Sequence, residues 1–255
     1  MRILITNDDG IHAPGLLALK KALQALGEVI VVAPERPRSA CGHAITLHKP
    51  LRLTKVRMGD GGEGYASNGT PADCVALGTS EHLGRRPALV VSGINLGPNL
   101  GVDMLYSGTV AAAMEAAICG LPSFAISVTS YEATDFQPAA EFAAVLAGEL
   151  LGREPPKGCF LNVNVPPVSR AEIAGVVFTR QGPLRYDNRM ERRTDPSGEH
   201  YYWFTGERVN HGDGPGSDVH AVSRNLISVT PVRLDLTSEA ALDQLNGWTI
   251  NWPNG

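Results

Sequence analysis

Two adjacent aspartates follow the first apolar segment of this chain. The chain begins MRILITNDDGIHAPGL, so Asn7, Asp8, Asp9 and Gly10 come directly after a short apolar, β-branched run. Neighbouring carboxylates repel each other, and a bound divalent cation relieves that repulsion. Mg²⁺ and Mn²⁺ prefer oxygen ligands. The pair therefore predicts a hard-cation site; in the alternative, one aspartate caps the next helix and the other is solvated.

Two later loops offer neutral oxygen ligands for the same cation. Ser39 lies in PERPRSACGHAIT and Asn95 lies in SGINLGPNLGVDMLYSGT, and each loop follows another apolar segment. His12 lies in the first polar loop and His43 in the second, and each is either a general acid or base or an ordinary structural histidine. The four cysteines are far apart and form no CxxC pair, which argues against zinc.

The segment YSGTVAAAMEAA predicts a phosphate contact. Ser107, Gly108 and Thr109 precede or begin an alanine-rich helix. A helix N-terminus presents free N–H groups and the positive end of the helix dipole, and small residues let a phosphate approach. The alternative is an ordinary helix cap. Beside a cation site, the segment favours a phosphate ester as ligand, held between cation and helix.

Three common nucleotide and ester motifs are missing where they would act. There is no GxxxxGK[ST] for a nucleoside triphosphate, the first apolar segment is not followed directly by the GxGxxG of a dinucleotide site, and there is no GxSxG for a nucleophile-elbow esterase.

Alternating strand and helix patterns must position these loops. Apolar strand-like runs alternate with helical periodicity over the first 165 residues, which predicts a mostly parallel α/β sheet covered by helices on both faces. Ligands bind such sheets at the carboxyl ends of the strands, where the polar loops lie. The expected strands are 2–6, 28–34, 88–93, 122–128 and 159–166; the expected helices are 15–27, 71–83, 109–120 and 136–152; 45–67 is expected to be extended around a Gly-rich turn.

The chain changes character after residue 165. Residues 185–209 contain a polar stretch, the turn signal Asp-Pro-Ser-Gly and an aromatic run, which together predict a projecting β-hairpin. A strand over 226–232 and a helix over 238–247 follow. The aromatic arm either contacts another subunit or folds onto its own domain as two extra strands.

Length and composition indicate an ordinary globular protein. The chain has 255 residues, of which 43% are hydrophobic and 19% are charged, and its net charge is −4. That charge does not suit a nucleic-acid polymer as partner. No segment has the length or apolarity of a signal peptide or a membrane span, so we expect a cytoplasmic protein without a membrane partner.

Taken together, the motifs resemble those of a known family. ILITNDDGIHAPGL, VVAPERPRSACGHAIT, GTPADCV, VVSGINLGPNLGVDMLYSGTVAAAMEA and DVHAVSRNLISVTP occur in order over nearly the whole chain. They resemble the SurE family of stationary-phase survival proteins, which are metal-dependent nucleoside monophosphate phosphatases. Two positions differ from the family pattern: Asn225 replaces a usual glycine, and Cys41 replaces a usual small residue.

The resemblance implies a site, a substrate and an assembly. It implies one divalent cation per subunit, Mg²⁺ or Mn²⁺. It also implies that a Rossmann-like core, residues 1–165, hydrolyses nucleoside 5′- and 3′-monophosphates. The C-terminal portion, residues 166–255, is expected to form a hairpin at about 180–210 and an exchanged tail that build a homodimer or homotetramer. The implied metal ligands are Asp8, Asp9, Ser39 and Asn95, with Asp8, Asp9 and Asn95 catalytic; the implied phosphate and substrate contacts are Asn7, Gly10, Asn99, Ser107, Gly108 and Thr109.

Three alternatives stay open at this point. The enzyme could act mainly on polyphosphate or on small phosphorylated metabolites, or the fold could serve a regulator that binds nucleotides without turnover. Within the catalytic reading, Asp8 could be a covalent nucleophile, although adjacent aspartates favour metal ligation with in-line attack by water.

Overall fold

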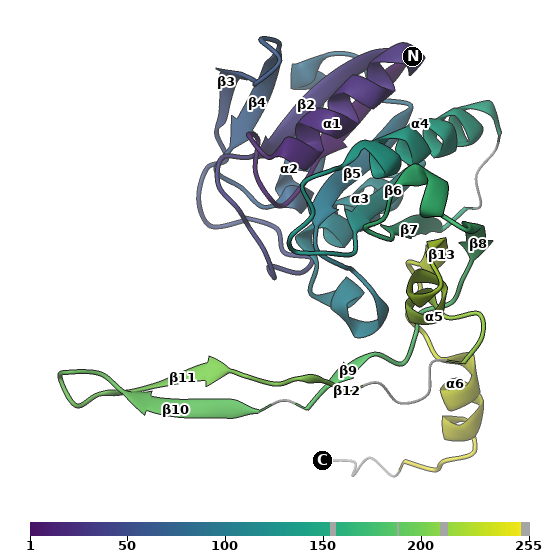
Figure 1. Ribbon diagram of the computed structural model, residues 1–255. Coiled ribbons are helices and arrows are strands. Elements are labelled where there is room, and N and C mark those ends of the chain that lie inside the picture. The colour runs from purple at the N-terminus through teal and green to yellow at the C-terminus, as the bar shows by residue number, and fades with distance from the viewer. Residues whose placement is uncertain (154–156, 188, 210–213, 251–255) are drawn as a thin grey trace.

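One large sheet forms the centre of the protein (Figure 1). The structure, a computed structural model, describes residues 1–153, 157–187, 189–209 and 214–250. Within these residues nine strands pair in the order β3-β4-β2-β1-β5-β6-β7-β13-β8. Their bounds are β1 Arg2–Thr6, β2 Glu28–Pro34, β3 Leu53–Arg57, β4 Glu63–Ser67, β5 Leu89–Leu96, β6 Ser123–Val128, β7 Cys159–Val165, β8 Gly175–Phe178 and β13 Leu226–Arg233.

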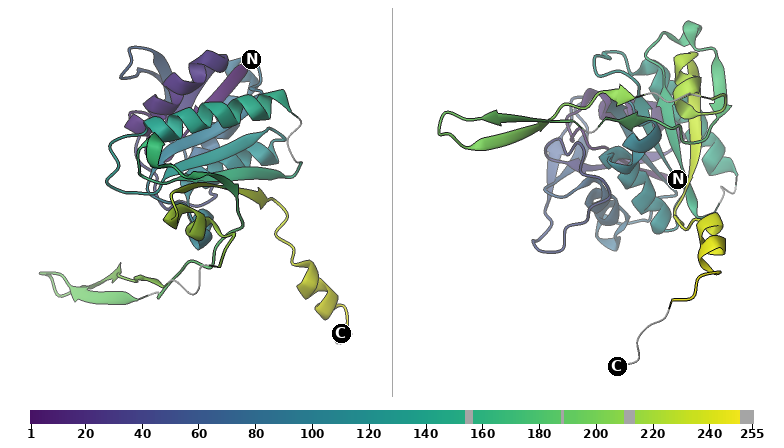
Figure 2. Two further views of the ribbon diagram at one scale, coloured as in Figure 1. Left: turned by 45° about the vertical axis from the view of Figure 1, so that its right-hand side comes forward. Right: turned by 90° about the horizontal axis from the view of Figure 1, so that it is seen from below.

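Helices cover both faces of the sheet, because successive side chains of each strand point to opposite faces. On β1, Ile3 and Ile5 pack in the core under α1 and α4, whereas Leu4 packs with Val75 of α2 and Ala112 of α3. The chain is thus layered helix, sheet, helix (Figures 1 and 2). The helices are α1 Pro14–Leu23, α2 Pro71–Thr79, α3 Gly108–Ile118, α4 Gln137–Gly152, α5 Asp218–Ser223 and α6 Glu239–Leu245.

The mostly parallel sheet confirms the expected fold class. Strands β1, β2, β4, β5, β6 and β7 run parallel, while β3 and β13 pair antiparallel to their neighbours β4 and β7. β5 extends to Leu96, beyond the expected end at 93, because its pairing with β6 resumes after an irregularity between Ser92 and Asn95. Strands from before and after residue 165 share the sheet, and the proposed division there stays a prediction.

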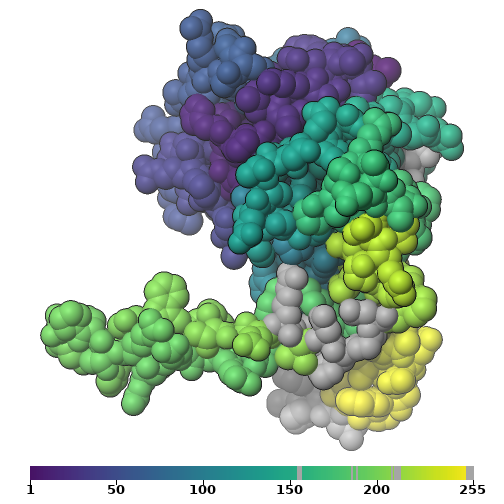
Figure 3. All heavy atoms as spheres, viewed as in Figure 1, coloured from purple at the N-terminus to yellow at the C-terminus, as the bar shows by residue number. Residues whose placement is uncertain are grey.

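The expected hairpin projects from the body of the protein (Figure 3). β10 (Met190–Thr194) pairs antiparallel with β11 (His200–Phe204), and β9 (Arg185–Tyr186) with β12 (Arg208–Val209) at its base. Every residue of β10 and β11 is exposed. Helix α6 also extends away from the sheet (Figure 2). Exchange of this tail between subunits stays a prediction. No helix in the described residues is long and apolar enough to cross a membrane.

Candidate active site

The polar loops meet in one cavity at the carboxyl ends of the central strands. Neighbouring strands β2, β1, β5 and β6 each contribute a loop to it, as expected for a parallel sheet. The cavity has a volume of about 240 Å³. Its lining consists of Asp8, Asp9, Ser39, Ala40, Asn95, Leu96, Pro98, Asn99, Asp103, Tyr106, Ser107, Tyr131 and Tyr186.

The loop after β1 is shaped by two of the predicted site residues. The amide Nδ2 of Asn7 donates to the carbonyl of Gly10 at 3.0 Å, and the Gly10 N–H donates to Asn7 Oδ1 at 3.2 Å. Gly10 has a φ of +98°, which favours glycine. Both residues lie behind the cavity lining, where they fix the backbone that carries the two aspartates. Direct contact of Asn7 or Gly10 with substrate stays a prediction.

The pKa values of both aspartates in the site are raised. Asp8 is buried, and its Oδ1 accepts a hydrogen bond from the hydroxyl of Thr109. Burial raises the pKa of Asp8. Burial, followed by the charge of Asp8, raises the pKa of Asp9 to about 6, although the Leu96 N–H donates to Asp9 Oδ2 at 3.1 Å. Two carboxylates that ionise reluctantly form a site that a cation stabilises.

Ser39 and Asn95, the predicted neutral oxygen ligands, line the cavity together with Asp8 and Asp9. The Arg38 N–H donates to the carbonyl of Asp8 at 2.7 Å, which holds the Ser39 loop against the β1 loop. Asn95 donates from Nδ2 to the carbonyl of Gly97 at 2.8 Å, so Oδ1 is the oxygen that it offers as a ligand. No cluster of three or more His, Cys, Asp or Glu side chains that could hold a metal occurs in the described residues. A set of two carboxylates, a hydroxyl and an amide oxygen suits Mg²⁺ or Mn²⁺ and is unlike a zinc site.

Helix α3 begins at the cavity. Ser107 caps the helix, its Oγ accepting from the Val110 N–H at 3.1 Å, and it lines the cavity. A Cβ on Gly108 would lie 2.8 Å from Asp8 Cβ and 3.0 Å from Cys41 Sγ, so only glycine permits this approach of helix and β1 loop. The N–H groups of Gly108 and Thr109, which follow Ser107, bond to the carboxylate of Asp8 and lower its pKa against the effect of burial. The start of α3 is therefore tied to Asp8. Gly108 and Thr109 are buried behind the lining.

A buried asparagine network positions Asn99. Its N–H donates to Asn164 Oδ1 at 2.9 Å and its Nδ2 donates to Ser127 Oγ at 2.7 Å. The carbonyl of Asn99 accepts from Nδ2 of Asn162 at 2.8 Å and of Asn164 at 3.0 Å. The family resemblance implied Asn99 as a phosphate contact, and Asn99 lines the cavity. Its supports on β6 and β7 have no local signal in the sequence, because they act across the sheet.

Seven lining residues were not predicted, and four of them carry an acidic or phenolic side chain, namely Asp103, Tyr106, Tyr131 and Tyr186. Tyr186, at the base of the hairpin, donates its hydroxyl to Asp103 Oδ2 at 3.0 Å. The hairpin base therefore helps to close the site of its own chain. The aromatic character of these loops was the signal available in the sequence.

A further unpredicted residue lies behind the site. Asp218 of α5 is buried, and its carboxylate accepts from the N–H groups of Gly101 at 2.9 Å, Gly182 at 2.8 Å and Val219 at 2.8 Å. Burial raises its pKa against the effect of these bonds. Asp218 thereby ties the loop after β5 to the segment before the hairpin.

The two histidines considered as general acid or base do not line the cavity. His12 is exposed, and His43 Nε2 lies 2.8 Å from Glu115 Oε2 on α3. The structure brings together Asp8, Asp9, Ser39, Asn95, Asn99 and Ser107, and these carry the candidate chemistry.

Comparison with known proteins identifies the family. The family described as "Survival protein SurE" matches residues 3–188. The chain belongs to the SurE family. It is 50% identical over 253 residues to "5'-nucleotidase SurE" of Desulfatibacillum aliphaticivorans, covering 99% of this chain and 100% of the relative. It is 49% identical over 249 residues to the protein of the same name from Heliobacterium modesticaldum, covering 97% and 92%.

A solved SurE structure has the same fold. The crystal structure of the Sure protein from Aquifex aeolicus superposes with a TM-score of 0.84 at 40% identity, covering 96% of this chain and 98% of that one. The expected SurE fold is therefore confirmed.

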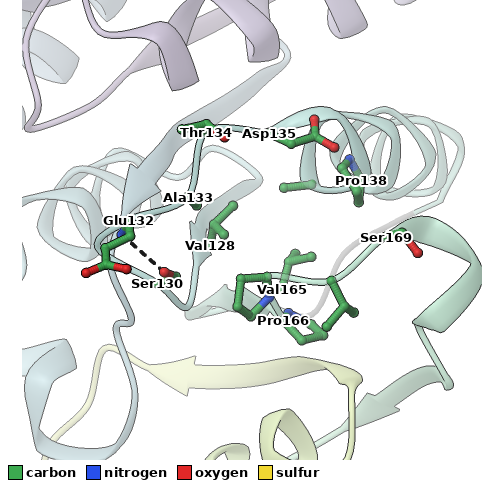
Figure 4. Close-up of a pocket in the computed structure, with 13 residues that line it drawn as sticks. Val128, Ser130, Glu132, Ala133, Thr134, Asp135, Pro138, Val165, Pro166 and Ser169 are labelled. Carbon is green, nitrogen blue, oxygen red and sulfur yellow. Dashed lines mark hydrogen bonds between the residues drawn. The ribbon is translucent and has the colours of Figure 1, made fainter.

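A wider hollow lies beside the SurE site without its chemistry (Figure 4). Its volume is about 440 Å³, and the loops after β6 and β7 line it together with the start of α4. Glu132 there is exposed, and its N–H donates to Ser130 Oγ at 3.1 Å. Asp135, the other carboxylate of this lining, is exposed as well and accepts from the Gln137 N–H at 2.8 Å. Both carboxylates are exposed, whereas Asp8 is buried beside Asp9, so the smaller cavity at Asp8 remains the candidate active site.

Proposed function

We propose that this SurE chain is a divalent-cation-dependent phosphatase that releases phosphate from nucleoside 5′- and 3′-monophosphates. The observation that carries the proposal is the convergence of Asp8, Asp9 and the start of α3 on one cavity. Relatives that are 49% and 50% identical in sequence are named 5′-nucleotidase, which supports the 5′ reaction.

The charge of the cavity explains why a cation is needed. Three aspartates line it, and no lysine or arginine is among the described lining residues. A phosphate monoester is itself an anion, so these walls repel it, and the partial positive charge at the start of α3 is too small to compensate. A divalent cation held by Asp8, Asp9, Ser39 and Asn95 would supply the missing charge, polarise a phosphoryl oxygen and acidify a bound water.

The residues of the chain supply positioning. Asn99, immobilised by Asn162 and Asn164, and Ser107 at the start of α3 bind phosphoryl oxygens and stabilise charge that develops on them. Thr109 holds Asp8 in one orientation through its hydroxyl. Asp8 already accepts this bond and is buried, which favours its role as a ligand over that of a covalent nucleophile.

Phosphate release tests the proposal. The metal-stripped protein is assayed on 5′- and 3′-monophosphates, ribose 5-phosphate and polyphosphate, with and without Mg²⁺ or Mn²⁺, beside Asp8→Asn. We expect cation-dependent release from the nucleotides, lost by at least 100-fold in the variant, because the ligand set is incomplete. Glu132→Gln, which removes an exposed charge that does not line the cavity, should keep full activity.

Each other outcome points elsewhere. Release without cation, or undiminished in Asp8→Asn, contradicts the ligand assignment. Faster turnover of polyphosphate or of ribose 5-phosphate assigns a different substrate class. Nucleotide binding without any release assigns a regulator, and a phosphorylated Asp8 trapped by mass spectrometry assigns covalent catalysis.

We also propose that the hairpin and tail assemble this chain into a homodimer or homotetramer. Tyr202, Trp203 and Phe204 of β11 are 58%, 57% and 79% exposed, which is unusual for adjacent large aromatic side chains. Sedimentation of the full chain beside a variant with all three changed to serine tests this: a smaller species is expected only for the variant.

A further inference from the structure

We infer that Tyr131 is a stacking platform for the base of the substrate and sets the preference of the site for phosphate esters that carry an aromatic base. The inference rests on the proposed function and deepens it, because it names a specificity-determining residue of the same cavity. Tyr131 lies in the loop between β6 and α4 and lines the cavity that contains Asp8 and Asp9.

The ring of Tyr131 lies against the backbone of Gly97. A Cβ placed on Gly97 would come within 2.3 Å of Tyr131 Cε1 and 2.7 Å of its Cδ1, so only glycine leaves room for the ring. Tyr131 is nevertheless 70% exposed. One part of the ring is thus supported by backbone while much of its surface remains open. This is the arrangement that stacking on a flat ligand requires.

The platform stands at a suitable distance from the phosphate end of the cavity. β1, β5 and β6 are neighbours in the sheet, and the Gly97 N–H donates to the carbonyl of Val128 at 3.0 Å, which joins the loops after β5 and β6. Two strand spacings of roughly 5 Å each separate the β1 loop from the β6 loop. That separation is comparable with the reach from a phosphate across one ribose to its base.

The segment between the platform and the aspartates is held by hydrogen bonds. The Leu96 N–H binds Asp9, and the carbonyl of Gly97 accepts from Asn95. The support under Tyr131 is therefore continuous with the candidate cation ligands. A base stacked on Tyr131 keeps its phosphate over these ligands. Because every base has a flat aromatic face, stacking accepts purines and pyrimidines alike.

Comparison of two substrates tests the inference. KM and kcat are measured for AMP and for ribose 5-phosphate, which lacks a base, in the wild type, Tyr131→Ala, Tyr131→Leu and Tyr131→Phe. For AMP we expect KM to rise about five- to tenfold in Tyr131→Ala and Tyr131→Leu, with little change in kcat, and to stay near the wild-type value in Tyr131→Phe. For ribose 5-phosphate all four proteins should have the same KM within about twofold. Inhibition by adenosine, which has no phosphate, should weaken in parallel with the AMP effect.

Two results would overturn the inference. Equal changes for AMP and ribose 5-phosphate would make Tyr131 a structural residue of the loop or a contact between subunits, and sedimentation of Tyr131→Ala would separate these. Loss in Tyr131→Phe equal to that in Tyr131→Ala would assign the effect to the hydroxyl and not to the ring. Activity of the wild type on AMP is established first, so failure of the proposed function is seen before any variant is compared.

Discussion

Replacing Asp9 with asparagine should stabilise the cation-free protein. Burial and the neighbouring Asp8 raise the pKa of Asp9 from its usual 3.8 to about 6, which means that the folded state resists ionisation of this carboxyl. Asparagine removes the charge and has nearly the same shape as aspartate. Its amide oxygen can still accept the hydrogen bond that the Leu96 N–H donates to Asp9 at 3.1 Å. The variant therefore loses a repulsion without losing a hydrogen bond.

The size of the effect follows from the pKa of Asp9. The difference between 3.8 and about 6 corresponds to about 3 kcal/mol at about 1.4 kcal/mol per pH unit. Asp9 is only half-buried, so solvent screening reduces this to about 1–2 kcal/mol. For a domain of this size the unfolding temperature should rise by roughly 3–6 °C.

The pH dependence has a definite sign. Because the folded pKa lies above the unfolded one, protonated Asp9 contributes stability that is complete below about pH 3.8 and is lost as the pH rises through about 6. The advantage of Asp9→Asn should therefore be greatest above pH 6 and should vanish towards pH 4. Mg²⁺ or Mn²⁺ should reverse the order at pH 8, because the wild type keeps both carboxylate ligands.

Thermal unfolding followed by circular dichroism measures these effects. Scans at pH 5, 6, 7 and 8 in EDTA, repeated with excess cation, compare the wild type, Asp9→Asn and the control Glu132→Gln. An unfolding temperature for Asp9→Asn that is below the wild type in EDTA at pH 8, or a difference that does not vary with pH, would refute the electrostatic account of the pair.

Two further predictions concern residues away from the carboxylate pair. Asp218→Ala leaves two buried N–H groups and one partly buried N–H group without their acceptor, and it should lower the unfolding free energy by about 3 kcal/mol in urea titration. Asp235→Ala, at an exposed carboxylate bonded to the Thr237 N–H, should lower it by under about 1 kcal/mol, and equal losses would contradict the buried role of Asp218. Asn225 has a φ of +56°, so Asn225→Gly should raise the unfolding free energy by up to about 0.5 kcal/mol in the same titration, and a loss of stability would show that the asparagine side chain is needed.

The convergence of the predicted metal ligands could be expected from the sequence, because Asp8 and Asp9 follow β1 and Asn95 lies near the carboxyl end of β5. Apolar runs locate the strands, parallel pairing brings their carboxyl ends together, and the polar residues there then meet. Asp8, Asp9 and Asn95 line one cavity for this reason. Ser39 lines the same cavity although it lies in no helix or strand. The hydrogen bond from the Arg38 N–H to the carbonyl of Asp8 fixes the loop that carries Ser39.

Tyr131, Tyr186 and Asp218 could not be found in the same way. Tyr131 depends on its contact with Gly97 in another loop, and Tyr186 depends on how the base of the hairpin approaches Asp103. The carboxylate of Asp218 bridges segments more than 30 residues away in sequence. No periodicity or capping signal encodes such pairings, because they arise only when the elements pack.

The projecting hairpin also determines what the tryptophans of this protein report. The chain has three tryptophans, of which Trp203 lies on β11, Trp248 follows α6, and Trp252 lies outside the described residues. Trp203 and Trp248 are 57% and 68% exposed, and neither contributes to the buried core. The fluorescence of Trp203 and Trp248 should therefore change little when the sheet melts, and it is instead a natural probe for whatever comes to cover the arm and the tail.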